Sequence, residues 1–240
     1  IHSPTQPVII LLGLDTWTFT ETLFGSFIII GAYLTLVLWI LPNFMKNRKP
    51  YKLTRILLLY NAFQVVFSAY AVSIVTTLLL YLSKHVDLLD TVFFVLRKKD
   101  SQVTFLHVFH HAIMITWVWL NYFYHPVDHF VFVGNSNSFV HVIMYSYYAL
   151  SSLGPEYAKY IWWKNYVTKL QLVSFCLPLY YYDKLTPCPI PPAFHYCCLF
   201  CISSFFFLFM NFYIRNYIAI KKKKINVINM DCNSDTKKTN

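Results

Sequence analysis

The chain has 240 residues, of which 57% are hydrophobic and 12% are charged, and its formal net charge is +10. Soluble domains carry roughly 25% charged residues, so this composition excludes an ordinary soluble enzyme, a disordered chain and a small disulfide scaffold. On a soluble protein the positive charge would point to nucleic acid, but in a membrane protein it indicates unequal loops on the two sides. We therefore predict an all-α polytopic membrane protein that is embedded in the lipid bilayer and binds no nucleic acid.

Apolar runs long enough to cross a bilayer follow one another along the chain. They cover residues 26–41, 56–96, 105–124, 130–150, 167–182 and 196–220. A transmembrane helix needs about 20 residues, so the run 56–96 holds two crossings with almost nothing left for a loop between them. The sequence thus predicts about seven transmembrane helices within 26–220, between a lumenal segment at 1–25 and a cytosolic basic tail at 221–240.

Positive residues are concentrated in alternate loops of this arrangement. Seventeen of the 20 Lys and Arg residues lie in 46–55, 97–99, 154–164 and the stretch from 215 onward. Because cytosolic loops are rich in Lys and Arg, the N-terminus is predicted to be lumenal and the C-terminus cytosolic. The chain ends in Lys237-Lys238-Thr239-Asn240, which resembles the dilysine retrieval signal of endoplasmic reticulum membrane proteins, although a solvated lysine-rich tail would look similar.

Ionisable side chains inside an apolar run are costly in a membrane and are usually functional. The first such group is Lys84, Asp87, Asp90 and Thr91 in the segment KHVDLLDT. On a helix Lys84, Asp87 and Thr91 share one face, and Lys84 can pair with Asp87 at a spacing of three residues. The group is a candidate for the functional site, or an internal ion pair that only holds helices together.

The second group is a cluster of three histidines, His107, His110 and His111. Spacings of three and four residues place the three imidazoles on one arc of a helix. A single histidine on an apolar face is usually a satisfied core residue, whereas three together point to chemistry. Neutral imidazole can act as a nucleophile, a general base or a metal ligand.

The third group is a polar stripe formed by Asn137, His141, Met144 and Tyr148, with Tyr145 beside it. Residues at this helical spacing can line a cavity, or they can serve only as hydrogen-bonding partners between helices. A fourth group at the predicted cytosolic boundary reads either as an aromatic belt with snorkelling lysines or as a ligand-binding patch. Its members are Trp162, Trp163, Lys164, Tyr166, Lys169 and Gln171.

These four groups, in this order, resemble the motifs of the ELO family of very-long-chain fatty acid elongases. The resemblance rests on KHVDLLDTVFFVLRKK, FLHVFHH, NSFVHVIMYSYYAL and WWKNYVTKLQ, and it covers most of Tyr33–Leu179. It implies a 3-oxoacyl-CoA synthase of the endoplasmic reticulum that condenses a long-chain acyl-CoA with malonyl-CoA, releasing CO2 and CoA. It also implies six helices around an acyl tunnel closed at the lumenal end, no cofactor, no metal, and partner enzymes that complete the elongation cycle.

The resemblance and the chemistry of the side chains together suggest roles for the polar groups. His110 is expected to take the acyl group as an acyl-imidazole. Asn137 and His141 are expected to donate hydrogen bonds to the developing oxyanion, while His107 and His111 orient groups or remove a proton.

The remaining candidates position catalytic groups or bind substrate. Asp87 and Asp90 are expected to position the imidazoles. The expected substrate contacts are Lys84, Thr91, Lys98, Lys99, Tyr145, Tyr148, Lys164, Lys169 and Gln171, of which Lys98, Lys99, Lys164 and Lys169 would meet the CoA phosphates. Bulk at Phe205–Phe209, near the lumenal end of the last spans, is expected to shorten the tunnel.

The chain departs from the family pattern between Asn61 and Lys84. ELO proteins usually carry some tens of lumenal residues there, whereas Lys84 follows Asn61 by only 23 positions. The departure also leaves Cys188 without a family-like partner. An inactive or truncated elongase paralogue is therefore one alternative function.

A di-iron lipid desaturase or hydroxylase is an alternative from another class of enzyme. Such sites use three histidine boxes, and the histidines off the predicted lumenal segments are only His85, His107, His110, His111 and His141. No cysteine or carboxylate cluster makes up the shortfall. A transporter is disfavoured because the spans contain no internal repeat, and formation of a homo-oligomer stays open.

Overall fold

A computed structural model describes residues 23–74, 77–123, 128–181 and 192–219. The predicted lumenal segment at 1–25, apart from its last three residues, lies outside this part of the chain. So do Cys188 and the tail at 221–240 that carries Lys237 and Lys238.

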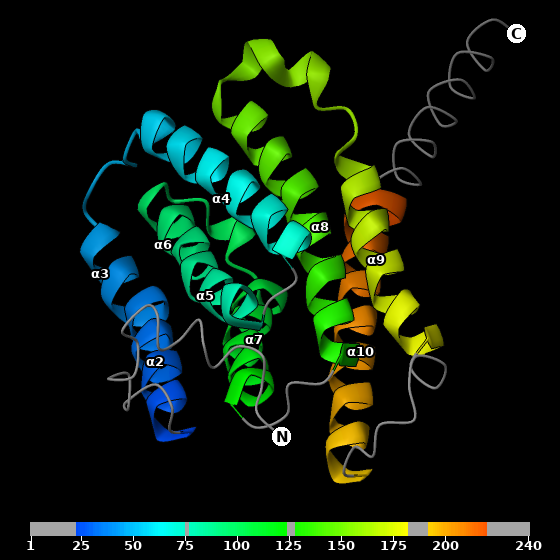
Figure 1. The fold of residues 1–240 in the computed structure, drawn as a ribbon. Coiled ribbons are helices and arrows are strands. Elements are labelled where there is room, and N and C mark those ends of the chain that lie inside the picture. Colours follow the sequence, from blue (N-terminus) through cyan, green and yellow to red (C-terminus); the bar gives the residue numbers. More distant parts are fainter. Residues whose placement is uncertain (1–22, 75–76, 124–127, 182–191, 220–240) are drawn as a thin grey trace, which may run out of the picture.

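The described residues form helices joined by short connections (Figure 1). The first rod consists of α2 (Leu23–Thr35), the π-helical turn η2 (Leu36–Ile40) and α3 (Leu41–Met45). The others are α4 (Thr54–Ile74), α5 (Thr77–Asp87) continued by α6 (Leu89–Leu96), α7 (Phe105–Phe123), α8 (Asp128–Ser152), α9 (Lys164–Tyr181), and α10 (Pro192–Tyr213) continued by the π-helical η5 (Ile214–Ile218). Short 3-10 turns cover Asp100–Gln102 (η3) and Pro155–Tyr160 (η4). These seven rods of the described chain correspond to the seven predicted helices.

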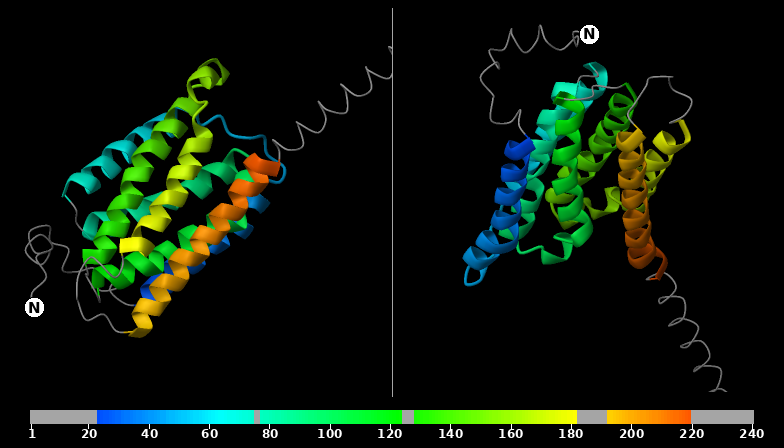
Figure 2. Two further views of the ribbon diagram at one scale, coloured as in Figure 1. Left: turned by 90° about the vertical axis from the view of Figure 1, so that its right-hand side faces the viewer. Right: turned by 90° about the horizontal axis from the view of Figure 1, so that it is seen from below.

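The rods lie roughly side by side, with the α2–α3 rod at one edge and α9 and α10 at the opposite edge (Figures 1 and 2). Between them α4 packs along α8, and α5 packs along α7. The tight hairpin predicted within 56–96 is present, because α4 ends at Ile74 and α5 begins at Thr77. In the second half of that run α5 passes into α6 at Leu88, whose backbone stays in the right-handed helical region.

Polar and apolar residues are distributed as in a membrane protein. Large apolar side chains are exposed on the outside, among them Leu59, Phe200 and Phe207, while ionisable residues such as Lys84 and Asp87 are buried inside. Three helices within the described ranges are long and apolar enough to cross a bilayer, at Phe24–Met45, Thr54–Ile74 and Tyr196–Ile218. Because lipid replaces water around such rods, the fold is that of an all-helical, multi-pass membrane protein.

Candidate active site

A buried carboxylate, that of Asp87 at the end of α5, is the centre of a hydrogen-bonded network. Lys84 Nζ lies 2.9 Å from Asp87 Oδ2, so the predicted pairing one helical turn apart is confirmed. Gln64 of α4 donates from Nε2 to Asp87 Oδ1 at 2.8 Å. The Tyr145 hydroxyl of α8 lies 3.1 Å from the same oxygen and 2.7 Å from Asp90 Oδ2. Three rods therefore meet at one carboxylate.

The histidine cluster occupies the first turns of α7, which begins after a capping threonine. The Thr104 hydroxyl accepts a hydrogen bond from the His107 backbone N–H at 3.3 Å, as expected for a helix N-cap. The His107 Nε2 atom lies 2.9 Å from Thr91 Oγ1 on α6, and Thr91 Oγ1 lies 2.7 Å from the Tyr33 hydroxyl on α2. The rings of His107 and His111 are 4.4 Å apart between centroids. His107 is thus held at both its backbone and its ring.

The His110 ring lies against aromatic side chains of α10. Its centroid is 4.9 Å from that of Phe205 and 6.1 Å from that of Phe209, and its buried Nδ1 has no hydrogen-bond partner among the described residues. Phe205 and Phe209, which were expected to shorten the acyl tunnel, therefore pack beside the histidine cluster. These phenylalanines are in the second half of α10, level with the histidine cluster, because the offset between neighbouring rods depends on their packing.

Two polar residues of α8 are connected to the Asp87 network. His141 Nδ1 lies 3.6 Å from Asp87 Oδ2, and Lys84 Nζ donates a hydrogen bond to Asn137 Oδ1. An ammonium group can only donate, so the Asn137 oxygen faces Lys84 and its NH2 group points elsewhere.

A cavity of about 500 Å³, which we call the polar chamber, joins these groups. Six of the seven rods contribute side chains to it, the α2–α3 rod being the exception among the described residues. Predicted site residues that line it are Asp90, His107, His110, His111, Asn137, His141, Tyr145, Tyr148, Lys164 and Gln171. The polar stripe of α8 thus lines a cavity, one of the two alternatives that its sequence left open.

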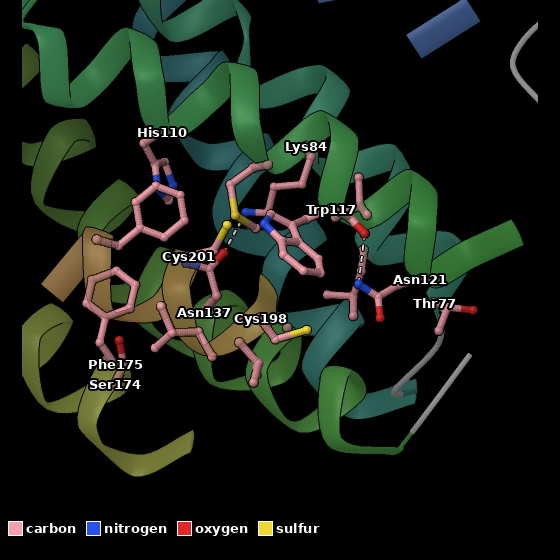
Figure 3. A pocket seen from close by; sticks show the side chains of 17 residues that line it. Thr77, Lys84, His110, Trp117, Asn121, Asn137, Ser174, Phe175, Cys198 and Cys201 are labelled. Atoms are coloured by element: carbon pink, nitrogen blue, oxygen red, sulfur yellow. Dashed lines mark hydrogen bonds between the residues drawn. The ribbon is translucent and has the colours of Figure 1, made fainter. Parts of the chain in front are cut away.

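A second, narrower cavity of about 100 Å³ continues from the same place and is lined mainly by apolar side chains; we call it the apolar pocket. His110 lies at one end, and Asn121 and Thr77 lie at the other (Figure 3). Asn121 follows His110 by eleven positions of α7, which corresponds to about 16 Å of helix. His110, Asn137, Ser174 and Phe175 line both cavities, so the histidine stands where the polar chamber meets the apolar pocket.

Three predicted phosphate contacts lie away from both cavities as far as the described residues define them. Lys98 has a φ of 53° and closes the end of α6, where the backbone N–H groups of Lys98 and Lys99 donate to Val95 and Phe94 carbonyls. Lys98 Nζ also lies 3.4 Å from the Lys46 carbonyl oxygen. Lys169 lies over the ring of Tyr166, 5.1 Å from its centroid.

Lys84 and Thr91, also predicted to contact substrate, are almost fully buried and bonded to other protein groups. Lys84 does reach the wall of the apolar pocket. Arg97, which was not predicted, lines the polar chamber instead of its two lysine neighbours.

Gln64 is the other residue that the sequence predictions missed. It belongs to a buried stripe of α4 formed by Asn61, Gln64, Ser68 and Ala71. The helical spacing of these small or polar residues in an apolar run was a readable signal, although their partners on other helices were not.

Comparison with known proteins identifies the family. The model of the GNS1/SUR4 (ELO) family matches residues 18–80 and 71–225. Very long chain fatty acid elongase 4 of Macaca mulatta is 37% identical over 241 residues, which cover 88% of this chain and 76% of that protein. Very long chain fatty acid elongase 7 of Rattus norvegicus is 35% identical, and the match covers 92% of this chain and 90% of that protein. Very long chain fatty acid elongase F of Drosophila simulans is 36% identical, and the match covers 93% of this chain and 96% of that protein.

The chain therefore belongs to the ELO family, as the four motifs predict. Within it the protein is a very-long-chain fatty acid elongase, the class of 3-oxoacyl-CoA synthases that perform the condensing step. The two pieces matched by the family model overlap at residues 71–80, within the short segment between Asn61 and Lys84. In the structure this is the junction of α4 and α5, of which residues 75 and 76 lie outside the description.

Proposed function

We propose that the enzyme condenses a long-chain acyl-CoA with malonyl-CoA in two half-reactions at His110. The observation that carries this proposal is the position of His110, the imidazole that lines both the polar chamber and the apolar pocket within the described chain. An acyl chain is apolar and CoA is polar, so a thioester bound across the junction has its reacting carbon beside this ring.

In the first half-reaction the unprotonated ring nitrogen of His110 attacks the thioester carbonyl carbon, and the carbon–sulfur bond breaks. The other ring nitrogen loses its proton, which the CoA thiolate takes up as it leaves as the thiol. The product is an acyl-imidazole, which hydrolyses readily in water. The apolar walls supplied by Phe205 and Phe175 exclude water from the acyl chain and so protect the intermediate.

In the second half-reaction malonyl-CoA occupies the polar chamber and loses CO2. The electron pair of the broken bond forms an enolate, which attacks the acyl carbon and displaces the His110 nitrogen. The products are 3-oxoacyl-CoA and CO2, and the displaced imidazolate nitrogen takes up one proton from solution to regenerate the neutral His110 ring. Both half-reactions place negative charge on the acyl oxygen, and Asn137 and His141 are the proposed donors to it.

The CoA moiety is proposed to bind at the side of the polar chamber lined by Arg97, Lys164 and Tyr217. Guanidinium and ammonium groups form charge-assisted hydrogen bonds with phosphate. This assignment replaces Lys98, Lys99 and Lys169 as the principal phosphate ligands, because the described side chains of those three lie outside the chamber.

We also propose the finer architecture and location that the sequence predicts. Six rods line the polar chamber, which supports a six-helix barrel around an acyl tunnel with α2–α3 outside it. The enzyme is proposed to reside in the endoplasmic reticulum, with its N-terminus lumenal and its C-terminus cytosolic, and to work with the other enzymes of the elongation cycle.

An inactive paralogue remains the second candidate function because of the short α4–α5 connection. The completed contacts between α4 and the rest of the site favour an active enzyme, since Gln64 of α4 reaches Asp87 of α5 at 2.8 Å. The shortened segment therefore leaves the network around the carboxylate intact.

Incubation of purified enzyme with acyl-CoA and carboxyl-labelled malonyl-CoA tests the proposal. His110→Ala is expected to abolish labelled CO2 release and the release of CoA from acyl-CoA alone. His85→Ala is the matched control, because His85 bonds to the Tyr81 carbonyl oxygen at 2.8 Å and lines neither described cavity. Full condensation activity in the His110 variant would overturn the assignment.

A further inference from the structure

Gln64 is a fully buried polar residue that the proposed mechanism does not use. Its relative exposure is 0%, although it lies on a helix that is long and apolar enough to cross a membrane. A buried amide is costly where its polar atoms lack hydrogen bonds, and Gln64 Oε1 has no partner among the described residues. Gln64 Nε2 donates to Asp87 Oδ1 at 2.8 Å and to the Tyr60 hydroxyl at 3.0 Å, so both of its N–H groups have partners.

The contacts divide the two oxygens of Asp87 between two tasks. Oδ1 receives Gln64 and Tyr145. Oδ2 receives Lys84 and faces His141 Nδ1 at 3.6 Å. Rotation of the carboxylate about its Cβ–Cγ bond would exchange the oxygens. The Gln64 N–H opposes that rotation, together with the Tyr145 hydroxyl, whose single proton is shared with Asp90 Oδ2 at 2.7 Å.

The orientation of Asp87 determines the orientation of both proposed oxyanion donors. Its Oδ2 atom faces Nδ1 of His141, so the other ring nitrogen points away from the carboxylate and donates to an oxyanion when the ring is in its imidazolium form. The same oxygen holds Lys84, whose Nζ fixes the oxygen of Asn137. The Asn137 NH2 group is then free to face the cavities that this residue lines.

We propose that Gln64 is a positioning residue for the oxyanion site: it fixes the Asp87 carboxylate, which aligns His141 directly and Asn137 through Lys84. This inference rests on the proposed function, because it gives Asn137 and His141 the role of oxyanion donors. Gln64 lines neither cavity among the residues described, so it acts on the rate of reaction and not on substrate binding.

Gln64→Met tests the proposal because it keeps a side chain of similar length and removes both N–H donors. We expect kcat for CO2 release to fall about 10-fold to 100-fold, the range for loss of a hydrogen bond to a charged group. The KM values for both CoA substrates should stay within about twofold, and the release of CoA from acyl-CoA alone should slow in parallel.

Ser68→Ala is the matched control. Ser68 lies one helical turn from Gln64 on the same buried stripe of α4, and its side chain lines neither described cavity. Its kcat should therefore stay near that of the unmodified enzyme. Equal losses of kcat in the two variants would show a general packing role for Gln64 and would overturn the proposal.

Two further outcomes would also count against it. One is an unchanged kcat in Gln64→Met. The other is a rise in KM that by itself accounts for the lower activity of this variant. If Gln64→Met does not fold, Gln64→Leu also removes both N–H donors, and the same fall in kcat is expected. Failure of the proposed function would appear separately, as activity retained by His110→Ala.

Discussion

Removal of the Lys84 charge should destabilise the fold far more than removal of a surface lysine. The relative exposures of the Lys84 and Asp87 side chains are 3% and 1%, and their charged atoms are 2.9 Å apart. Loss of one partner from such a buried pair costs about 3–5 kcal/mol, because the other charge stays buried without compensation. At about 2–4 °C per kcal/mol for a chain of this size, Lys84→Met should lower the unfolding midpoint by about 6–20 °C.

The double variant distinguishes a charge effect from a loss of packing. Lys84→Met combined with Asp87→Asn leaves no buried charge in the pair, and the new amide oxygen can still accept from Gln64 and Tyr145. We expect the double variant to recover at least half of the decrease in unfolding midpoint that Lys84→Met causes. Lys169→Met, at an exposed lysine, should change it by less than about 2 °C.

Thermal unfolding in detergent, followed by tryptophan fluorescence, measures these midpoints. The reasoning fails if Lys84→Met unfolds within about 2 °C of the unmodified protein. It also fails if the double variant is no more stable than the single one, since the uncompensated carboxylate would then not be the cause.

Five further variants test the cavities and the histidine cluster. Gly134→Ala places a methyl group against the Leu80 side chain in the apolar pocket and should shift products to shorter acyl chains, whereas Leu80→Ala should shift them to longer ones; gas chromatography of the products measures both. Arg97→Ala should raise the KM for acyl-CoA about 10-fold, whereas Lys98→Ala should leave it unchanged. Thr91→Val removes the hydroxyl that contacts His107 and Tyr33 and should lower kcat about 10-fold at constant KM. Unchanged product lengths, equal KM effects at positions 97 and 98, or normal turnover in Thr91→Val would contradict the respective assignments.

Contacts between residues one or two helical turns apart could be predicted from the sequence. The Lys84–Asp87 pair and the common arc of His107, His110 and His111 follow from the helical repeat alone. The cavity-lining stripe of α8 follows from the same repeat. In each case one helix supplies all the residues, so no knowledge of packing is needed.

Contacts between helices could not be predicted in this way. The bond from Gln64 to Asp87 depends on how α4 packs beside α5, and the level of Phe205 against His110 depends on the offset between α10 and α7. Arg97 lines the polar chamber and Lys98 does not. This difference depends on where α6 ends, because Lys98 adopts the left-handed backbone conformation that closes the helix. Sequence patterns predict which residues of a helix lie on its inward face. The offsets between neighbouring rods and the ends of the helices are properties of the assembled fold.

The α2–α3 rod, at the edge of the molecule, is linked to the histidine cluster by hydrogen bonds. Phe27, Leu38 and Trp39 of α2 and η2 are exposed and would face the hydrocarbon, whereas Tyr33 on the inner side lies one hydroxyl group away from His107 through Thr91. Bilayers that are thinner or thicker than a helix change its tilt. We therefore expect turnover to vary with the acyl length of the surrounding phospholipid in proteoliposomes, at lipid compositions where the helices remain fully folded.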